Sequence, residues 1–259
     1  MSALLERYQM VRLLQSFAFL YLTLCVALFF LQRALLYFPQ PAMVDGPQET
    51  IPVPGARLAI SVRPASGPNA VIYFGGNAED VSQTLVAFNG AFPGYALYLL
   101  HYRGFGGSSG KPSEEALLAD GLALYDYVRA RHSHVAVVAR SLGSGLGVYL
   151  AGQRPVARLV LVTPYDSILG VAKKSFPFFP VSLLLRDKYE SWRYAPQVTA
   201  PTLIVVAEFD EVIPRASSDL LRTRFIGNVP VYEVISGAGH NTISEYERYR
   251  EVVERFVSQ

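Results

Sequence analysis

The sequence predicts an α/β fold, in which helices cover both faces of a mostly parallel, twisted sheet. Short apolar stretches alternate along the chain with longer amphipathic segments, a pattern typical of α/β domains. Several of the apolar stretches are continuous rather than alternating, as expected of central parallel strands that are buried on both faces. The length of 259 residues fits one large domain.

The first expected element is a membrane-spanning helix near the N-terminus. Residues 13–31 contain no charged side chain. As a helix they would be about 28 Å long, close to the ~30 Å hydrocarbon thickness of a bilayer. Arg12 and Arg33 flank this stretch, and Tyr8 and Tyr37 lie just outside it, where aromatic side chains favour the membrane interface. A single-pass anchor is therefore expected.

Two alternatives remain open for this N-terminal segment, residues 1–34. A cleaved signal peptide would need small residues at its cleavage site, whereas residues 28–33 are mostly bulky. A buried core helix would normally have a polar face. As an anchor, the segment has Arg7 and Arg12 before its apolar stretch and only Arg33 closely after it. The N-terminus is therefore expected in the cytoplasm, with the rest of the chain on the opposite side of the membrane.

The remaining elements are expected in one domain, residues 35–259. Residues 35–54 are rich in proline and are expected to form an irregular neck. The expected strands are Leu58–Val62, Ala70–Phe74, Tyr95–His101, Val135–Ala139, Leu159–Val162, Leu203–Val206 and Val231–Ile235. The expected helices are Asp80–Asn89, Ser113–Arg131, Leu142–Gln153, Ala216–Arg224 and Ile243–Val257. Residues 169–200 form an apolar, aromatic insertion, expected to be a lid or an addition to the core.

Composition narrows the classes of partner and cofactor. The net charge is +2 and no long basic run occurs, so nucleic acid is not an expected partner. Cys25 is the only cysteine, which excludes a disulfide framework and a cysteine-type zinc site. The glycine-rich stretch 104–112 fits neither a Walker loop nor a dinucleotide-binding motif. No cofactor and no metal are expected.

Ser141 is the candidate nucleophile. It follows the apolar run Val135–Ala139 and lies among small residues, including Gly143. Such a segment is typical of a tight strand-to-helix turn that exposes a serine hydroxyl above a sheet. Ala139 stands where the usual pattern has glycine, and its extra methyl group is expected to crowd the turn.

His240 is the candidate base that would take the proton of Ser141. It lies in a glycine-rich loop after the last expected strand, where the imidazole can turn toward a pocket. Of the other histidines, His101 ends a strand and could shape the floor of the site. His132 and His134 lie in a polar turn and are expected to be solvated.

Asp210 is the candidate acid that would orient the base. It lies just beyond the carboxyl end of a strongly apolar strand, at the edge where open α/β sheets place their ligands. Glu208, Glu211 and Asp166 are its rivals for this role.

The negative charge that develops on a substrate carbonyl oxygen needs backbone N–H donors. Leu142, which follows the nucleophile, would supply one donor. Asn77, in the small-residue loop 74–78 after an early strand, would supply the other. An ordinary glycine turn is the alternative for that loop.

The order Ser141, Asp210, His240, with the early oxyanion loop and the segment Tyr102–Gly106, resembles the α/β-hydrolase superfamily. The resemblance covers roughly residues 35–259 and implies an α/β-hydrolase fold with a short lid insertion. Within the superfamily, the chain is similar to small membrane-anchored serine hydrolases related to protein-depalmitoylating thioesterases.

The chain departs from the pattern of that family at three positions. Gly75 stands where the family often has histidine, Ala139 where the elbow has glycine, and Ala207 where a glycine commonly precedes the acid. The missing histidine is expected to leave the oxyanion loop less firmly braced, while the backbone donors remain.

The expected function is that of a membrane-anchored serine hydrolase that cleaves esters or thioesters of apolar acyl groups. The expected partners are the bilayer and an acyl substrate, which could be a lipid or a lipidated protein. Two alternatives are a serine peptidase or amidase, which would use the same triad, and a catalytically weak scaffold that binds a partner at the membrane.

Overall fold

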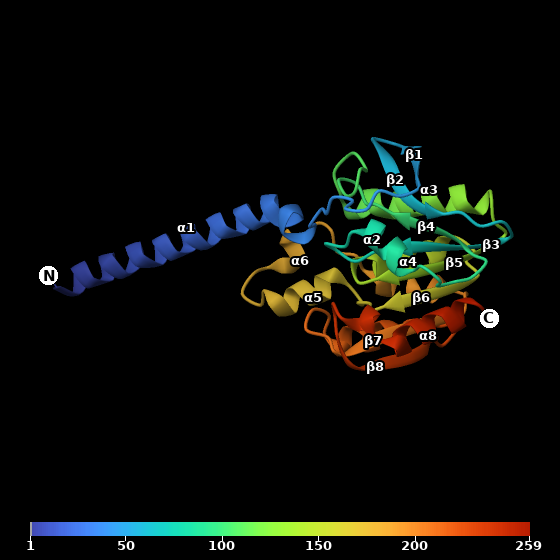
Figure 1. The fold of residues 1–259 in the computed structure, drawn as a ribbon. Coiled ribbons are helices and arrows are strands. Elements are labelled where there is room, and N and C mark those ends of the chain that lie inside the picture. The colour runs from blue at the N-terminus through green and yellow to red at the C-terminus, as the bar shows by residue number, and fades with distance from the viewer. Residues whose placement is uncertain (1) are drawn as a thin grey trace.

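The computed structural model describes residues 2–259 and has an eight-stranded sheet at its centre (Figure 1). The strands lie in the order β1-β2-β4-β3-β5-β6-β7-β8. Their bounds are β1 (Gln48–Val53), β2 (Ala56–Arg63), β3 (Asn69–Phe74), β4 (Ala96–Leu100), β5 (His134–Arg140), β6 (Arg158–Val162), β7 (Thr202–Phe209) and β8 (Val231–Gly239). From β4 to β8 every neighbouring pair is parallel, whereas β1 and β2 pair antiparallel at one edge. The predicted mostly parallel sheet is confirmed.

Helices cover both faces of this sheet. Their bounds are α1 (Ser2–Leu36), α2 (Val81–Ala87), α3 (Glu114–Arg129), α4 (Leu142–Gln153), α5 (Ile168–Ser175), α6 (Val181–Leu184), α7 (Arg215–Arg222) and α8 (Glu247–Val257). Alternate residues of β3 belong to separate cores, since successive strand residues point to opposite faces. Ile72 packs in the cluster that holds α3 and α4 side chains, and Val71 packs in the cluster that holds those of α2 and α8.

The expectation of an irregular neck over residues 35–54 is wrong at both of its ends. Residues 35–36 continue α1, and residues 48–53 form β1, which pairs with β2 along its whole length. Pro52 lies in β1 opposite Arg57. Because β1 is an edge strand, a proline that donates no ladder hydrogen bond is tolerated there. The many prolines concealed this strand.

The last helix also begins later than expected. Residues 243–245 form a separate 3₁₀ turn, and Tyr246 is extended, with φ −84° and ψ 131°. The α-helix therefore starts at Glu247, and it buries Val252, Val253 and Phe256 against the sheet.

Helix α1 projects from the body of the molecule (Figure 1). Among the described residues it is the one helix long and apolar enough to cross a membrane, over Leu4–Leu36. Most of its side chains are exposed, including Phe17, Phe19 and Phe30. The helix extends two residues beyond the predicted segment, and Met1 of that segment lies outside the described residues.

The insertion, residues 169–200, lies beside the C-terminal part of α1 (Figure 1). It contains most of α5, all of α6 and two 3₁₀ turns, Ser191–Arg193 and Ala195–Gln197. Its Asp187 receives a bidentate ion pair from Arg33 of α1, at 2.9 and 3.1 Å. The insertion therefore joins the long helix to the body.

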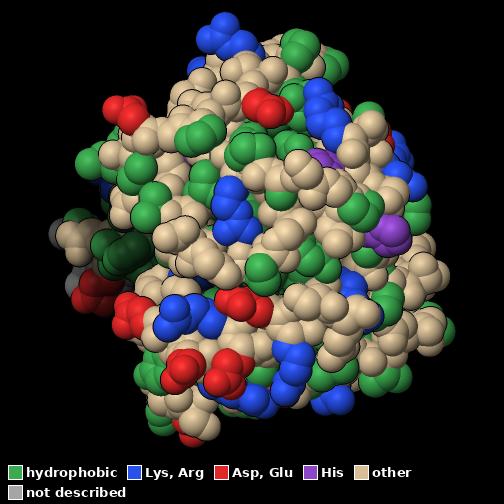
Figure 2. Space-filling view, turned by 45° about the vertical axis from the view of Figure 1, so that its right-hand side comes forward, with side chains coloured by type: hydrophobic (Ala, Val, Ile, Leu, Met, Phe, Trp, Pro, Cys, Tyr) green, Lys and Arg blue, Asp and Glu red, His purple; other side chains and the backbone are tan. Residues whose placement is uncertain are grey.

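A face of the body turned away from the outer end of α1 carries basic and acidic side chains mixed together (Figure 2).

One of the two histidines expected to be solvated is in fact buried. His132 pairs with the Tyr98 hydroxyl and the Gly67 carbonyl, both at 3.0 Å, and is 7% exposed. His134 begins β5 and is exposed, as expected.

His101 is buried beneath the glycine-rich loop, with its Nε2 2.8 Å from Ser61 Oγ. Burial lowers the pKa of His101, so the unfolded chain binds a proton at this histidine before the folded chain does. The folded state therefore loses stability as the pH falls below about 6.5, the ordinary histidine value.

We expect the thermal midpoint to fall between pH 7 and pH 5, and His101→Gln to make that fall shallower. Thermal denaturation followed by circular dichroism across this range measures it. The same control substitution at exposed His134 should leave the slope as in the parent; an unchanged slope in His101→Gln would contradict the assignment.

Candidate active site

Ser141 lies in the turn that joins β5 to α4, in a strained backbone conformation. Its φ is 48° and its ψ is −116°, values that non-glycine residues rarely adopt. Such strain occurs chiefly at functional sites. The following turn of α4 passes so close to β3 that a Cβ at Gly143 would collide with the carbonyl oxygen of Phe74.

The methyl group of Ala139 is accommodated by a glycine on the neighbouring helix. A Cβ placed on Gly147 of α4 would lie 2.7 Å from the Ala139 Cβ, closer than two such atoms approach. In the usual elbow pattern a glycine at the position of Ala139 leaves room for the helix. Here the missing side chain of Gly147 on the helix leaves that room instead. The expected crowding of the turn is relieved in this way.

Ser141, His240 and Asp210 are brought together at the carboxyl edge of the sheet. Ser141 Oγ lies 3.0 Å from His240 Nε2, and His240 Nδ1 lies 2.9 Å from both Asp210 carboxylate oxygens. The side chains of His240 and Asp210 are each 6% exposed. The Asp210 carboxylate also accepts backbone N–H bonds from Val212 and Ile213, at 3.0 and 2.7 Å. These bonds hold its orientation.

The three rival acids have other partners. Glu208 accepts the N–H of Gly237, and Glu211 accepts the N–H of His240 at 3.0 Å, so both support the histidine loop. This bond from the His240 backbone lowers the pKa of Glu211. Asp166 pairs with the hydroxyl of Ser217. Within the described part of the chain, none of the three carboxylates forms a hydrogen bond with the imidazole ring of His240.

The backbone N–H groups of Asn77 and Leu142 form no hydrogen bond within residues 2–259 and remain available as donors. The loop that carries Asn77 is held from several sides. The Tyr102 hydroxyl donates to the Gly75 carbonyl at 2.7 Å, and the Gly76 N–H donates to Glu79 at 2.6 Å. These contacts brace the loop in the absence of the histidine that the family often has at the position of Gly75.

Comparisons with known proteins agree with this architecture. No family model matches the chain. It is 34% identical over 230 residues to an uncharacterized protein of Mycobacterium tuberculosis, covering 81% of this chain and 80% of that protein. It is 32% identical over 206 residues to the alpha/beta hydrolase domain-containing protein 17B of Xenopus tropicalis, covering 74% of this chain and 68% of that protein. The chain belongs to the α/β-hydrolase family.

Solved structures agree on the fold of this α/β hydrolase. The esterase Pf2001 of Pyrococcus furiosus superposes with a TM-score of 0.68 at 15% identity, covering 85% of this chain and 98% of that one. A serine hydrolase homologue from Coxiella burnetii superposes with a TM-score of 0.60 at 20% identity, covering 82% and 98%. At these identities the likeness establishes the fold.

An ion pair that the sequence analysis missed links the two loops of the hydrolase site. Arg140, the residue before Ser141, pairs with Glu79 at 3.2 Å and donates to the His240 carbonyl at 3.1 Å. Glu79 also accepts the hydroxyls of Tyr73 and Thr84. Interaction with Glu79 outweighs burial and raises the pKa of Arg140.

A signal for this pair exists in the sequence. Glu79 and Arg140 are opposite charges that closely follow or end two apolar strands, and the carboxyl ends of parallel strands meet at one edge. The sequence does not show that β3 and β5 are neighbours in the sheet, and this neighbouring position is what brings Glu79 and Arg140 into contact.

The hydrolase has a polar cavity of about 460 Å³ at Ser141. The lining includes Glu79, Asp80 and Arg140 as well as Ser141 and His240. His101 is not among the lining residues, although its strand ends nearby. Within residues 2–259, no group of three or more His, Cys, Asp or Glu side chains is placed to hold a metal ion.

Proposed function

We propose that this chain is a membrane-anchored serine hydrolase that cleaves carboxylic esters or thioesters of apolar acyl groups. The observation that carries the proposal is the continuous hydrogen-bonded series from Ser141 Oγ through the His240 ring to Asp210. A strained serine at the start of a helix supports the same assignment, since the turn presents Oγ rather than burying it.

In the first step, His240 Nε2 takes the proton of Ser141 as the hydroxyl oxygen attacks the acyl carbonyl carbon. Asp210 accepts the Nδ1 proton of His240 in a hydrogen bond and stabilises the imidazolium that forms. As the tetrahedral intermediate collapses, His240 returns its proton to the leaving alcohol or thiol, and the acyl group stays on Ser141. A water molecule, deprotonated by His240, then releases the acid.

The N–H groups of Asn77 and Leu142 donate to the oxygen that becomes negative in each intermediate. Removal of one such donor typically costs about 3–4 kcal/mol of transition-state stabilisation. Here the Asn77 side chain secures the position of its own backbone, because Nδ2 donates to the Leu36 carbonyl at 2.5 Å and Oδ1 accepts the Phe38 N–H at 3.0 Å.

Asn77→Ala keeps the backbone donor but removes both side-chain bonds. We expect kcat to fall about tenfold with little change in KM, because bonds of about 0.5–1.5 kcal/mol each no longer hold the donor in place. Steady-state kinetics on an activated ester measure this.

Asn228→Ala is the matched control. Asn228 lies in the loop before β8 and donates to the Ala200 carbonyl at 2.7 Å. This bond lies at the amino ends of the strands, whereas the candidate site lies at their carboxyl ends. Asn228→Ala should cost similar stability and leave kcat as in the parent. Equal kcat in the two variants would remove the Asn77 side chain from this role.

Helix α1 supports the membrane part of the proposal, because its length and exposed apolar surface suit a bilayer. The arginine bias supports an orientation with the N-terminus in the cytoplasm and the hydrolase body on the other side. Protease protection of membrane vesicles that contain the full chain tests this orientation. Digestion of the body from the cytoplasmic side would reverse it.

Labelling with a fluorophosphonate, followed by turnover of p-nitrophenyl esters and the matching thioesters and anilides, tests the activity. We expect label on Ser141 and turnover of esters and thioesters well above that of the anilides. Faster anilide cleavage would identify an amidase. Absence of both label and turnover would leave a hydrolase-like scaffold and overturn the proposal.

A further inference from the structure

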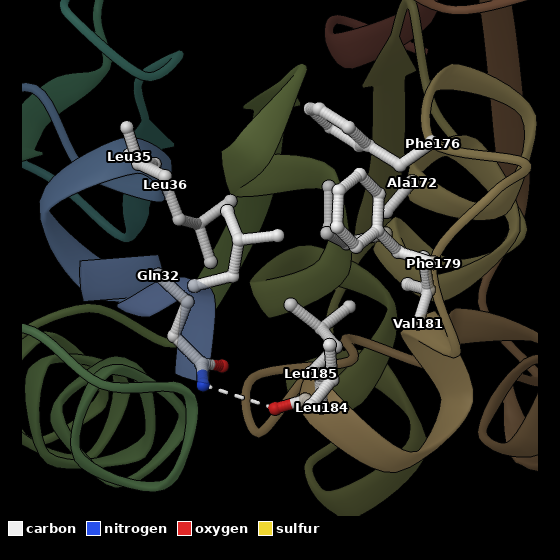
Figure 3. Close-up of a pocket in the computed structure, with 11 residues that line it drawn as sticks. Gln32, Leu35, Leu36, Ala172, Phe176, Phe179, Val181, Leu184 and Leu185 are labelled. Atoms are coloured by element: carbon white, nitrogen blue, oxygen red, sulfur yellow. Dashed lines mark hydrogen bonds between the residues drawn. The ribbon is translucent and has the colours of Figure 1, made fainter. Parts of the chain in front are cut away.

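An apolar groove lies between the end of α1 and the insertion (Figure 3). Its volume is about 170 Å³. Leu28 and Leu36 form the wall on α1, and Ala172, Phe176 and Phe179 face them from the insertion. An engineered apolar cavity of about 150 Å³ holds benzene, so the enclosed part of this groove has room for about six carbon atoms.

Polar contacts at one end keep the two walls of the groove apart at a fixed spacing. Gln32 donates to the Leu184 carbonyl at 3.0 Å and accepts the Arg186 N–H at 2.6 Å; the first of these bonds is drawn in Figure 3. The next residue, Arg33, forms an ion pair with Asp187 that holds the same two segments, and the Asp187 side chain is 5% exposed. The groove is therefore a built feature rather than a loose contact.

The insertion follows α1 into the region that a bilayer would cover. Tyr21 of α1 donates to the Phe178 carbonyl at 2.9 Å and stacks on Phe179 with ring centroids 5.8 Å apart. Tyr21 lies about 16 Å along the helix from Gln32. The outer surface of the insertion is apolar there, with Phe178 85% and Leu183 82% exposed. The part of the insertion around Phe178 would therefore lie in a bilayer at the same depth as Tyr21 of α1.

The groove adjoins the cavity that contains Ser141. Leu36 lines the groove, Asn77 lines the cavity, and the two residues are hydrogen-bonded. The cavity is lined largely by polar side chains and the groove by apolar ones. Together they match the two ends of an acyl ester, with the carbonyl and leaving group in the cavity and the hydrocarbon in the groove.

We infer that the groove between α1 and the insertion binds the acyl chain of a substrate that enters sideways from the bilayer. The inference rests on the proposed function and names its substrate class as long-chain acyl esters or thioesters held in a membrane. The hydrocarbon passes from lipid to groove beside the membrane-spanning part of α1. The groove is lined by apolar side chains except for Gln32, so methylene groups held in it are largely shielded from water.

Ala172→Trp fills the groove and tests this binding. The full chain is reconstituted in phosphatidylcholine vesicles with p-nitrophenyl palmitate or p-nitrophenyl butyrate as the probe. We expect kcat/KM for palmitate to fall about tenfold or more, since several buried methylene groups lose their contacts. Butyrate, whose chain is too short to reach far into the groove, should change less than about twofold.

Lys173→Trp, on the next and exposed residue of α5, is the matched control and should alter neither rate. Equal loss of palmitate turnover in both variants, or undiminished palmitate turnover in Ala172→Trp, would overturn the inference while ester hydrolysis stands. Loss of all turnover in the parent chain would instead count against the proposed function.

A second measurement does not depend on the tryptophan variant. The Ser141→Ala chain in vesicles is irradiated with a diazirine-bearing palmitic acid, and the labelled peptides are mapped by mass spectrometry. We expect labels in residues 28–36 and 172–185. Labels spread along α1 with none in residues 172–185 would show a lipid-coated helix and no acyl site.

Discussion

Replacing Ser141 with alanine is expected to lower kcat/KM for esters by about 10,000-fold or more, as removal of a triad serine does in related chemistry. The alanine keeps the Cβ and so keeps the backbone strain at φ 48°. Ester turnover and fluorophosphonate labelling measure the loss. Retained activity would remove Ser141 from its role as the nucleophile.

Ser141→Gly separates catalysis from stability at the same position. It should be as inactive as the alanine variant but more stable, since glycine adopts a positive φ freely. Relief of about 1–3 kcal/mol of strain, less about 0.5–1 kcal/mol of glycine chain entropy, leaves a gain of about 1 kcal/mol. Urea unfolding of the two variants measures it. A glycine variant less stable than the alanine variant by about 0.5–1 kcal/mol would show that the turn holds no strain.

Glu79→Ala is expected to lower the free energy of unfolding by about 3–5 kcal/mol, because Arg140 would remain largely buried without its partner. The Gly76 N–H would also lose its acceptor. The oxyanion loop would then be free to shift, and we expect kcat to fall about 100-fold, comparable to loss of one oxyanion donor. Denaturant unfolding and steady-state kinetics measure the two effects.

Two further variants serve as controls for Glu79→Ala. Asp126→Ala removes a bidentate ion pair with Arg154 on the surface, where both side chains are at least one-third exposed; it should cost at most about 1 kcal/mol and no activity. Glu79→Gln keeps an acceptor for the Gly76 N–H and should recover part of kcat. If Glu79→Ala resembles the surface variant in both measurements, the ion pair does not position the site.

The sequence predicted the parallel sheet well because burial on both faces requires continuous apolar runs, as in Val135–Ala139 and Leu203–Val206. It failed at β1, since the prolines of an edge strand resemble those of a loop. For the candidate site, the sequence nominated Ser141, Asp210 and His240, and the structure brings these three side chains within hydrogen-bonding distance of one another.

Other features of the site depended on contacts between segments far apart in the sequence. The compensation of Ala139 by Gly147 depends on how closely α4 packs on β5. The bracing of the oxyanion loop depends on Tyr102, Glu79 and the end of α1. None of these is a local pattern, because each joins elements whose spacing only the folded sheet determines.

The hydrogen bond from Asn77 to the carbonyl of Leu36, the last residue of α1, has a mechanical consequence. In a bilayer, a helix longer than the hydrocarbon layer tilts, and the tilt changes with membrane thickness. Because α1 is held to the body at Arg33 and to the loop of Asn77 at Leu36, a change of tilt of α1 in a bilayer would move the proposed oxyanion donor at Asn77. For the proposed membrane-anchored hydrolase, we therefore expect the rate to change with the thickness of the membrane.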